Sequence, residues 1–366
     1  MKTRSWCQWR TQWNFWKCSR SGSAWLRALL VVLALTSVAG ADVFDMPDGR
    51  QSIEFVTVGN AGNTGELSGA GAGGFGPDRV CGQVDYEYGI GTFEVTAAQY
   101  CEFLNAVAAT DTYLLYNVNM WGGSQGGKIE RTGSAGSYQY SVADDWADRP
   151  ANYVSWGDAA RFCNWLTNGQ PTGPQGPATT EDGSYALNGA TSVGAVNAVV
   201  RRTVAEGARY VVPSEDEWYK AAFHAADGAT GNYYDYPTGQ DVLPANDLVD
   251  PDPGNSATFW DGDLTVGSPY YRTVVGDHEN SASPHGTFDQ GGNVWEWNEA
   301  VIEDDYRGMR GSSYFSVSAT LHASYRYSVY ATSEDAPYGF RVVDLGAEPE
   351  PIPGDADQDG DVDIED

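Results

Sequence analysis

Three stretches of the chain place apolar residues at helical spacing, and each begins behind a side chain that can cap a helix. The stretches start after Thr96, Ser155 and Ser214. Three residues beyond each hydroxyl stands an acceptor side chain: Gln99, Asp158 and Glu217. This is the spacing of a capping box, in which both side chains satisfy backbone N–H groups at the helix start. The pattern predicts three amphipathic helices, and we interpret these acceptors as caps rather than as catalytic groups.

Outside these helices, apolar and polar residues alternate only over short stretches, which indicates short strands separated by long irregular loops. Alternating apolar residues predict strands over 52–58 and 84–95. Residues 59–76 and 231–271 are dominated by turn-forming residues, and 167–202 has the composition of a surface insertion. Few helices, short strands and much irregular backbone predict an α+β domain.

The first 41 residues are typical of an export signal. Six basic residues precede the apolar run 28–35, which is too short to span a bilayer, and Ala39, Gly40 and Ala41 are small residues suited to cleavage. We expect a signal peptide over 1–41, cleaved near Ala41, and a secreted or extracytoplasmic mature chain without a membrane span. An uncleaved anchor is the alternative.

Charge narrows the choice of partners. The chain has 21 Lys and Arg against 50 Asp and Glu, a formal net charge of −29. Six of the basic residues and none of the acids lie in the leader, so the mature chain is more acidic still. Such a surface repels nucleic-acid backbones and anionic lipids and favours cations. We therefore expect no nucleic-acid partner.

The stretch 287–298 combines a flexible turn with acids and tryptophans. The glycines and asparagine at 291–293 can adopt positive φ, and Asp289 and Glu296 flank them. Carboxylates and backbone carbonyls are the ligands that calcium prefers. A cation site is one interpretation, and a tight hairpin whose two tryptophans belong to the core is the other.

The string GGNVWEW at 291–297 is the most specific of an ordered series of motifs. The others lie at 90–104, 149–163, 212–222, 310–314 and 339–341. The series spans roughly residues 50–345 and resembles the formylglycine-generating enzyme family, also called the sulfatase-modifying factor family.

This resemblance implies a fold and two calcium sites. The fold, expected over 42–345, is a variant of the C-type lectin fold with low regular secondary structure. The first site would use the side chains of Asp289 and Glu296 and the backbone carbonyls of Gly292 and Val294. A second site is implied within 231–271, and its alternative ligands are Asn246 and Asn255.

Catalytic members of this family oxidise a substrate cysteine to formylglycine with two cysteines that bind copper. Thiolates suit this task because they select Cu(I). Matching the motif puts the first thiol at Ser316 and the second near 321–323, yet no cysteine follows Cys163. Copper is therefore not expected. Ser313 and Ser316 mark the lost site, and no catalytic residue is assigned.

Other groups near that site have two interpretations. Tyr314 and Arg326 fall in the region of the family's substrate groove, where they would bind a protein or peptide ligand. Alternatively, Arg326 and Arg341 form internal ion pairs with nearby acids and stabilise the fold.

Three histidines could serve as an alternative set of copper ligands: His278, His285 and His322. The mature chain has three cysteines: Cys81, Cys101 and Cys163. Cys101 and Cys163 are the candidate disulfide pair. The alternative is that all three are buried thiols.

The C-terminal tail is a separate unit. Residues 346–354 form an extended Pro/Glu linker. Beyond it, alternate acids with a glycine at the sixth position match a calcium loop, and its ligands would be Asp355, Asp357, Asp359, Asp361, Asp363 and Asp366. The loop at 355–366 resembles a truncated dockerin repeat. A cohesin-type partner is expected only if the dockerin is complete.

These observations support a preferred hypothesis and an alternative. The preferred one is an exported, calcium-stabilised family member that lacks the catalytic cysteine pair and serves as a binding or scaffold module. The alternative is an active oxidoreductase of this type that modifies a sulfatase cysteine through a different metal site.

Overall fold

The structure is a computed structural model that describes residues 52–303 and 305–346. The predicted signal peptide, most of the linker and the predicted calcium loop at 355–366 lie outside the described residues. The helices and strands are, in chain order, β1 (Phe55–Val58), β2 (Glu66–Ser68), η2 (Ala70–Ala72), β3 (Arg79–Cys81), β4 (Tyr88–Gly91), α1 (Ala97–Val107), α2 (Asn119–Gly122), β5 (Ile129–Thr132), β6 (Gln139–Val142), α3 (Asp144–Ala147), α4 (Trp156–Thr167), α5 (Val193–Asn197), η3 (Val204–Glu206), β7 (Tyr210–Val211), α6 (Glu215–Phe223), β8 (Trp295–Ile302), β9 (Tyr306–Arg310), η4 (Ser318–Leu321), β10 (Tyr327–Tyr330), β11 (Tyr338–Gly339) and β12 (Val343–Asp344).

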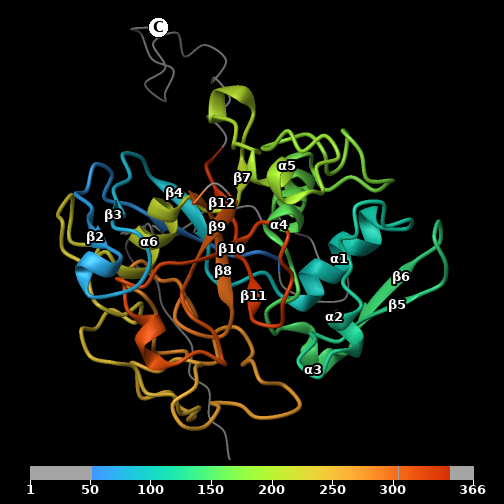
Figure 1. Cartoon of the computed structure of the whole chain (residues 1–366). Helices are drawn as coiled ribbons and strands as arrows, with labels where there is room; N and C mark the ends of the chain where they lie inside the picture. Colours follow the sequence, from blue (N-terminus) through green and yellow to red (C-terminus); the bar gives the residue numbers. More distant parts are fainter. Residues whose placement is uncertain (1–51, 304, 347–366) are drawn as a thin grey trace, which may run out of the picture. The chain divides into compact units, whose positions relative to one another are not determined.

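Two small sheets organise these elements. The first has the order β1-β4-β12-β7, and β12 joins distant segments because Val343 pairs with both Ile90 and Val211. The second has the order β10-β9-β8-β11, with β8 and β9 antiparallel and β11 parallel to β8. Two hairpins, β2-β3 and β5-β6, complete the strand pairing of the described residues. In the view of Figure 1, β8, β9 and β10 lie between α6 on one side and α1 and α4 on the other.

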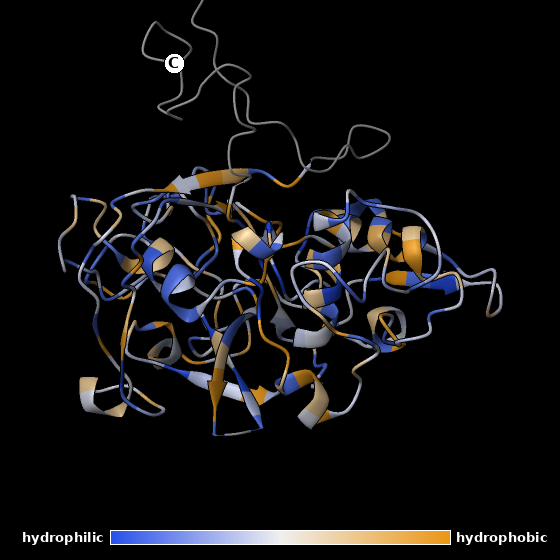
Figure 2. Ribbon diagram, turned by 90° about the horizontal axis from the view of Figure 1, so that it is seen from above, coloured by the Kyte–Doolittle hydropathy of each residue, from blue (hydrophilic) through white to orange (hydrophobic). Residues whose placement is uncertain are grey.

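The three predicted helices are confirmed, each with its capping box. Thr96 starts α1, Ser155 starts α4 and Ser214 starts α6, and in each the hydroxyl accepts from the backbone N–H three residues later. Figure 2 shows hydrophobic and hydrophilic residues alternating around the helical turns. The buried faces of α1 and α4 meet in an aromatic cluster, in which the ring of Phe162 lies 5.3 Å from those of Phe103 and Phe340. Local capping signals therefore placed the helices correctly.

The strands and one loop differ from expectation. The strands predicted over 52–58 and 84–95 are present but shorter, as β1 and β4. Part of the loop predicted over 59–76 pairs as β2 and folds as η2. The segment 167–202, predicted as a surface insertion, is largely exposed or half-buried, but part of it is in the core: Glu181 and Tyr185 are buried, and Arg161 Nε of α4 donates to Glu181 Oε1 at 2.7 Å. A polar residue that is buried by pairing with a helix looks like a surface residue in a sequence. No helix of the described residues is long and apolar enough to cross a membrane.

Candidate functional site

The signature turn packs tightly between two other segments. Gly292 has a φ of 94°, and a Cβ on it would collide with the backbone carbonyl of Thr258. The backbone N–H of Asn293 donates to Thr258 O at 2.8 Å, and that of Tyr314 donates to Asn293 O at 3.0 Å. The turn therefore requires glycine for both its φ and its close approach. It holds the start of β8 against residues 311–314.

Both tryptophans of the signature are in the core, as the hairpin interpretation expected. Trp295 is 5 % exposed and Trp297 is fully buried. Trp297 Nε1 donates to Val154 O at 2.8 Å. Glu296 between them is also fully buried, so both faces of this part of β8 are covered.

The carboxylate of Glu296 is held by two donors. Arg341 forms a two-pronged pair with it, Nε to Oε2 at 2.6 Å and Nη2 to Oε1 at 2.7 Å. Trp218 Nε1 of α6 donates to Oε2 at 2.7 Å. Such a pair neutralises the buried charge of Glu296.

Two neighbouring acids, Glu94 and Asp289, have no arginine hydrogen-bonded to their carboxylates. Glu94 is 2 % exposed, and neither of its carboxylate oxygens has a hydrogen-bond partner. Its pKa is raised well above the usual range because burial removes water and because Asp289 and Glu296 carry like charges nearby. Asp289, with a φ of 58°, accepts from Gly276 N–H at 2.6 Å, and burial raises its pKa as well. Two acids therefore lie close together, Glu94 buried and Asp289 half-buried.

This donor set fits the calcium ion that the resemblance implies. Calcium takes carboxylate and carbonyl oxygens, and an unpartnered buried carboxylate beside Asp289 lacks the positive charge that calcium would supply. Among the described residues, no three His, Cys, Asp or Glu side chains are placed to hold a metal ion by themselves. A calcium ion here would therefore need further ligands, such as the backbone carbonyls of Gly292 and Val294 that the resemblance implies.

Ser316, at the position of the first thiol, and the nearby Ser313 lie together beside Trp295. Ser313 and Ser316 share a hydrogen bond with 2.8 Å between their Oγ atoms, and Trp295 Nε1 donates to Ser316 Oγ at 3.1 Å. The structure brings the two predicted residues into one hydroxyl cluster. This cluster contains no thiolate that could hold Cu(I).

Tyr314 lies next to this cluster and rests on a buried cation. Its hydroxyl donates to Gln125 Oε1 at 2.8 Å, and the guanidinium of Arg272 lies 5.8 Å from the centre of its ring. Arg272 is fully buried, two of its nitrogens, Nε and Nη2, have no partner, and burial lowers its pKa to about 10. Sequence reasoning missed Arg272 because its loop has no periodicity to mark it.

Arg326, the other predicted groove residue, lies in a separate ion-pair network. Its Nε and Nη2 donate to the two oxygens of Glu215, each at 2.7 Å, and Arg310 Nη2 donates to Glu215 Oε1 at 2.8 Å. Despite burial, the arginines Arg310, Arg326 and Arg79 lower the pKa of Glu215 to about 2. Arg326 therefore forms an internal ion pair, as the alternative interpretation expected, and the structure does not bring it together with Tyr314.

The cysteines do not form the disulfide considered above. Cys81, Cys101 and Cys163 are all buried outside any disulfide, so the Cys101–Cys163 pairing is wrong. Burial and Glu215 raise the pKa of Cys81 to about 11, although three arginines oppose this. A thiol of such high pKa is a poor nucleophile and a poor metal ligand at neutral pH.

The histidines of the alternative copper set lie apart. His278 Nε2 shares a hydrogen bond with Thr258 Oγ1 at 3.0 Å, and His322 Nε2 lies 3.4 Å from Asp235. His285 faces His224, with 3.4 Å between the ring nitrogens. The described residues therefore offer no three-histidine centre.

The alternatives for a second calcium site are both engaged in loop hydrogen bonds. Asn255 Oδ1 accepts from Thr238 Oγ1 at 2.6 Å, and Asn246 Nδ2 donates to Asp263 O at 3.2 Å. As expected, residues 231–271 contain no helix or strand, only isolated bridges. Neither asparagine is distinguished as a calcium ligand.

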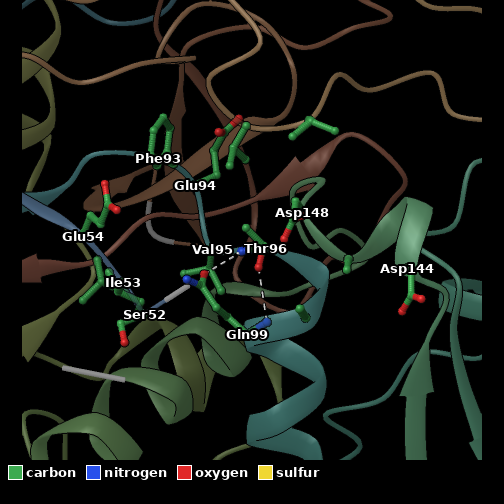
Figure 3. A pocket seen from close by; sticks show the side chains of 15 residues that line it. Ser52, Ile53, Glu54, Phe93, Glu94, Val95, Thr96, Gln99, Asp144 and Asp148 are labelled. Carbon is green, nitrogen blue, oxygen red and sulfur yellow. Dashed lines mark hydrogen bonds between the residues drawn. The ribbon is translucent and has the colours of Figure 1, made fainter. Parts of the chain in front are cut away.

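A pocket of about 680 Å³ lies beside the start of α1, and sequence reasoning did not anticipate it. Its walls combine acids with apolar side chains such as Ile53, Phe93 and Val95 (Figure 3). Among its lining residues are four acids: Glu54, Glu94, Asp144 and Asp148. Serines 313 and 316 do not line it, so it is distinct from the hydroxyl cluster.

The architecture and site define a class of protein, an α+β domain with low regular secondary structure built around a buried GGNVWEW turn. The sequence matches the family model described as "Sulfatase-modifying factor enzyme 1-like domain" over residues 72–345. The chain belongs to this family, the formylglycine-generating enzyme family, and has its variant of the C-type lectin fold.

Solved structures with a similar arrangement are distant in sequence. CarF is 20 % identical, with 80 % of this chain and 98 % of that chain covered and a TM-score of 0.41. Variable protein 1 of Treponema denticola is 15 % identical, with 81 % and 97 % covered and a TM-score of 0.45. PvdO from Pseudomonas aeruginosa is 15 % identical, with 80 % and 94 % covered and a TM-score of 0.43. No curated protein matches the sequence. The family assignment rests on the sequence match.

Proposed function

We propose that this protein is an exported, calcium-stabilised member of the formylglycine-generating enzyme family that acts as a binding or scaffold module. In this proposal it does not carry out the thiol-dependent oxidation of its catalytic relatives. The observation that carries the proposal is the hydroxyl cluster of Ser313 and Ser316, which stands where the resemblance puts the first copper thiolate. Alcohols are hard, weakly acidic ligands, so they do not select Cu(I) as thiolates do.

The surroundings of the cluster support binding rather than redox chemistry. Trp295 and Tyr314 pack beside the serines and are themselves buried, and Trp295 already donates its N–H to Ser316. Arg272 beneath Tyr314 has N–H groups without a partner. The protein or peptide ligand of this proposal rests on the family resemblance, because these side chains are themselves buried.

Calcium in this proposal stabilises the fold and does not react. The side chains of Asp289 and Glu296 and the carbonyls of Gly292 and Val294 would hold it, as in the family. When bound, the ion supplies positive charge to a buried acidic region. Asp289 and Gly292 then fix the turn that precedes β8, and β8 in turn positions Trp295 beside the serines.

A direct activity assay tests the proposal. The purified full chain is incubated with a cysteine-containing sulfatase peptide, copper and oxygen, and the peptide is analysed by mass spectrometry. We expect the cysteine to remain unmodified, whereas a formylglycine product would overturn the proposal. An active family enzyme assayed in parallel shows that the peptide and copper are competent.

The alternative of an active enzyme with another metal site receives no support from the described residues. Its best ligand set was His278, His285 and His322, and these side chains face different partners. Partner binding through the tail remains a prediction that depends on a complete dockerin.

A further inference from the structure

The pocket of about 680 Å³ beside the start of α1 has apolar walls built by segments that are far apart in the sequence. Its lining residues come from 52–54, from 93–99, from 144–148 and from 274–275, together with Val342. More than half of them are apolar: Ile53, Phe93, Val95, Ala98, Ala147, Val274, Val275 and Val342. The pocket can therefore bury the hydrocarbon part of a ligand.

Backbone hydrogen bonds hold these segments in place. The N–H of Thr92 donates to Glu54 O at 2.8 Å, and the N–H of Val275 donates to Asp148 O at 2.9 Å. The capping box of Thr96 fixes the start of α1 in the wall of the pocket. The pocket is thus part of the folded framework.

The exposed rim of the pocket carries negative charge only. Three lining residues are exposed acids, Glu54, Asp144 and Asp148, and no lining residue is Lys, Arg or His. In the view of Figure 3, Glu54 lies on one side of Val95 and the two aspartates lie on the other. In the part of the chain that the structure describes, the carboxylates of Glu54 and Asp148 have no ion-pair partner. Such a rim attracts cations.

The arginine next to the rim is directed elsewhere. Arg149 follows Asp148 in the sequence, but its guanidinium lies 4.0 Å from the centre of the Tyr270 ring. The same guanidinium donates to the backbone carbonyl of Arg272. Arg149 does not line the pocket, so it does not place a positive charge in it.

The fourth acid of the pocket, Glu94, does not contribute to the rim. It is among the lining residues, but both of its carboxylate oxygens are buried. Its charge interacts with Arg341 and Arg272 inside the fold. The charge offered to a ligand is therefore that of the three exposed acids.

We propose that this pocket binds an arginine or lysine side chain from a basic peptide segment of a partner protein. The aliphatic stem of such a side chain packs on the apolar walls, while the charged head stays among the exposed carboxylates. A chain with a net charge of −29 attracts a basic segment, and the pocket gives that segment a specific place. The inference rests on the proposed role as a binding module and adds a second site, away from Ser313 and Ser316.

Peptide binding to the purified full chain tests this inference. The probe is a dye-labelled peptide in which arginine alternates with glycine, and fluorescence anisotropy is measured at about 150 mM salt, where long-range attraction is screened. A second peptide carries citrulline, the uncharged counterpart of arginine, at the same positions. Free arginine is added as a competitor to distinguish a peptide segment from a small amine ligand.

Three variants separate the pocket from general attraction. Glu54→Gln combined with Asp148→Asn removes two charges from the rim. Asp85→Asn combined with Glu87→Gln is the matched control, because it removes the same charge from exposed acids outside the pocket. Val274→Phe fills part of the pocket without changing its charge. The unfolding temperature of each variant shows whether the fold is retained.

We expect the rim variant to bind the arginine peptide at least about tenfold more weakly than the parent, because charge-assisted contacts are lost. Val274→Phe should also weaken binding, and the matched control should bind like the parent. The citrulline peptide should bind far more weakly than the arginine peptide, and free arginine should compete only at much higher concentration than the unlabelled peptide.

Four results overturn the inference. Equal weakening by the rim variant and the matched control would mean attraction without a site, and unchanged binding to Val274→Phe would place the peptide outside the pocket. Tight binding of the citrulline peptide would exclude a charged head, and competition by free arginine as strong as by the peptide would make the ligand a small amine. The sulfatase assay is independent of all four, since a formylglycine product refutes the proposed function and leaves peptide binding at the pocket unaffected.

Discussion

Two buried acids in this protein have opposite surroundings. Glu215, at the start of α6, is 3 % exposed and accepts from Arg310 and Arg326. Glu94, before α1, is equally buried at 2 % exposure and has no partner at either oxygen. The pKa of Glu215 falls to about 2 because guanidinium groups outweigh its burial, and that of Glu94 rises well above its usual range.

The difference separates a completed structural network from a site that needs an additional group. Around Glu215, protein side chains supply all the positive charge, so this region gains nothing from an added cation. Around Glu94 and Asp289, the guanidinium of Arg341 is already paired with Glu296, and Arg272 interacts with Glu94 only electrostatically, without a hydrogen bond to either of its oxygens. The same fold therefore contains one ion-pair network that is self-sufficient and one acidic region for which we propose calcium.

Glu215→Gln should have the largest effect on stability. Removing this charge leaves Arg310 and Arg326 buried without a counter-charge, and breaking a buried network in this way costs about 3–5 kcal/mol. Chemical denaturation measures the change in the free energy of unfolding. Asp216→Asn is the control, since its side chain is 25 % exposed. Equal effects of the two variants would contradict the network described here.

Calcium removal should destabilise the protein by an amount that depends on calcium concentration. At a free calcium concentration one hundred times the Kd, a ligand that binds only the folded state adds about 2.7 kcal/mol. Comparing denaturation curves in calcium and in chelator measures this difference. Asp289→Asn should abolish it, whereas Asp216→Asn should leave it intact. A calcium response that survives in Asp289→Asn would place the ion elsewhere.

In chelator, the free energy of unfolding should depend on pH because of the raised pKa of Glu94. An acid whose pKa is higher in the folded state binds its proton more tightly there, so stability is lost as pH rises from its ordinary value near 4.5 toward the raised folded pKa. The loss is about 1.4 kcal/mol for each unit of the shift. Between about pH 5 and 8 in chelator, the stability of the parent should fall with rising pH relative to that of Glu94→Gln. Parallel curves in chelator would refute the raised pKa.

Arg79→Ala should have the smallest effect within the Glu215 network. Its guanidinium contacts Glu215 and Asp216 at 3.1 and 2.5 Å, but the side chain is 38 % exposed. Exposed ion pairs contribute about 0–1 kcal/mol. Arg326→Ala, whose side chain is 4 % exposed, should be several times more destabilising in the same unfolding assay. If Arg79→Ala matches Arg326→Ala, burial does not control the strength of these pairs.

Local signals in the sequence predicted what local physics determines. The capping boxes at Thr96, Ser155 and Ser214 involve residues three apart, so they could be identified without tertiary structure. The GGNVWEW string is also local: Gly292 has a positive φ and no room for a Cβ, and both tryptophans are buried.

Long-range pairing could not be predicted in this way. Glu94 stands between two apolar residues without a cap spacing, which was the only signal of its unusual position. Its environment depends on residues 288–296 and 341, almost two hundred positions or more away along the chain. Likewise, the assignment of Arg326 to Glu215 rather than to the groove depends on how β10 packs near α6. Such partners become apparent only when the fold is assembled.

Elemental analysis of the full-length protein, purified without chelator, tests the central claim most directly. The account predicts bound calcium and no copper, because acids and carbonyls surround the signature turn whereas hydroxyls occupy the position of the lost thiol. Copper bound in a one-to-one ratio beside Ser313 and Ser316 would contradict it.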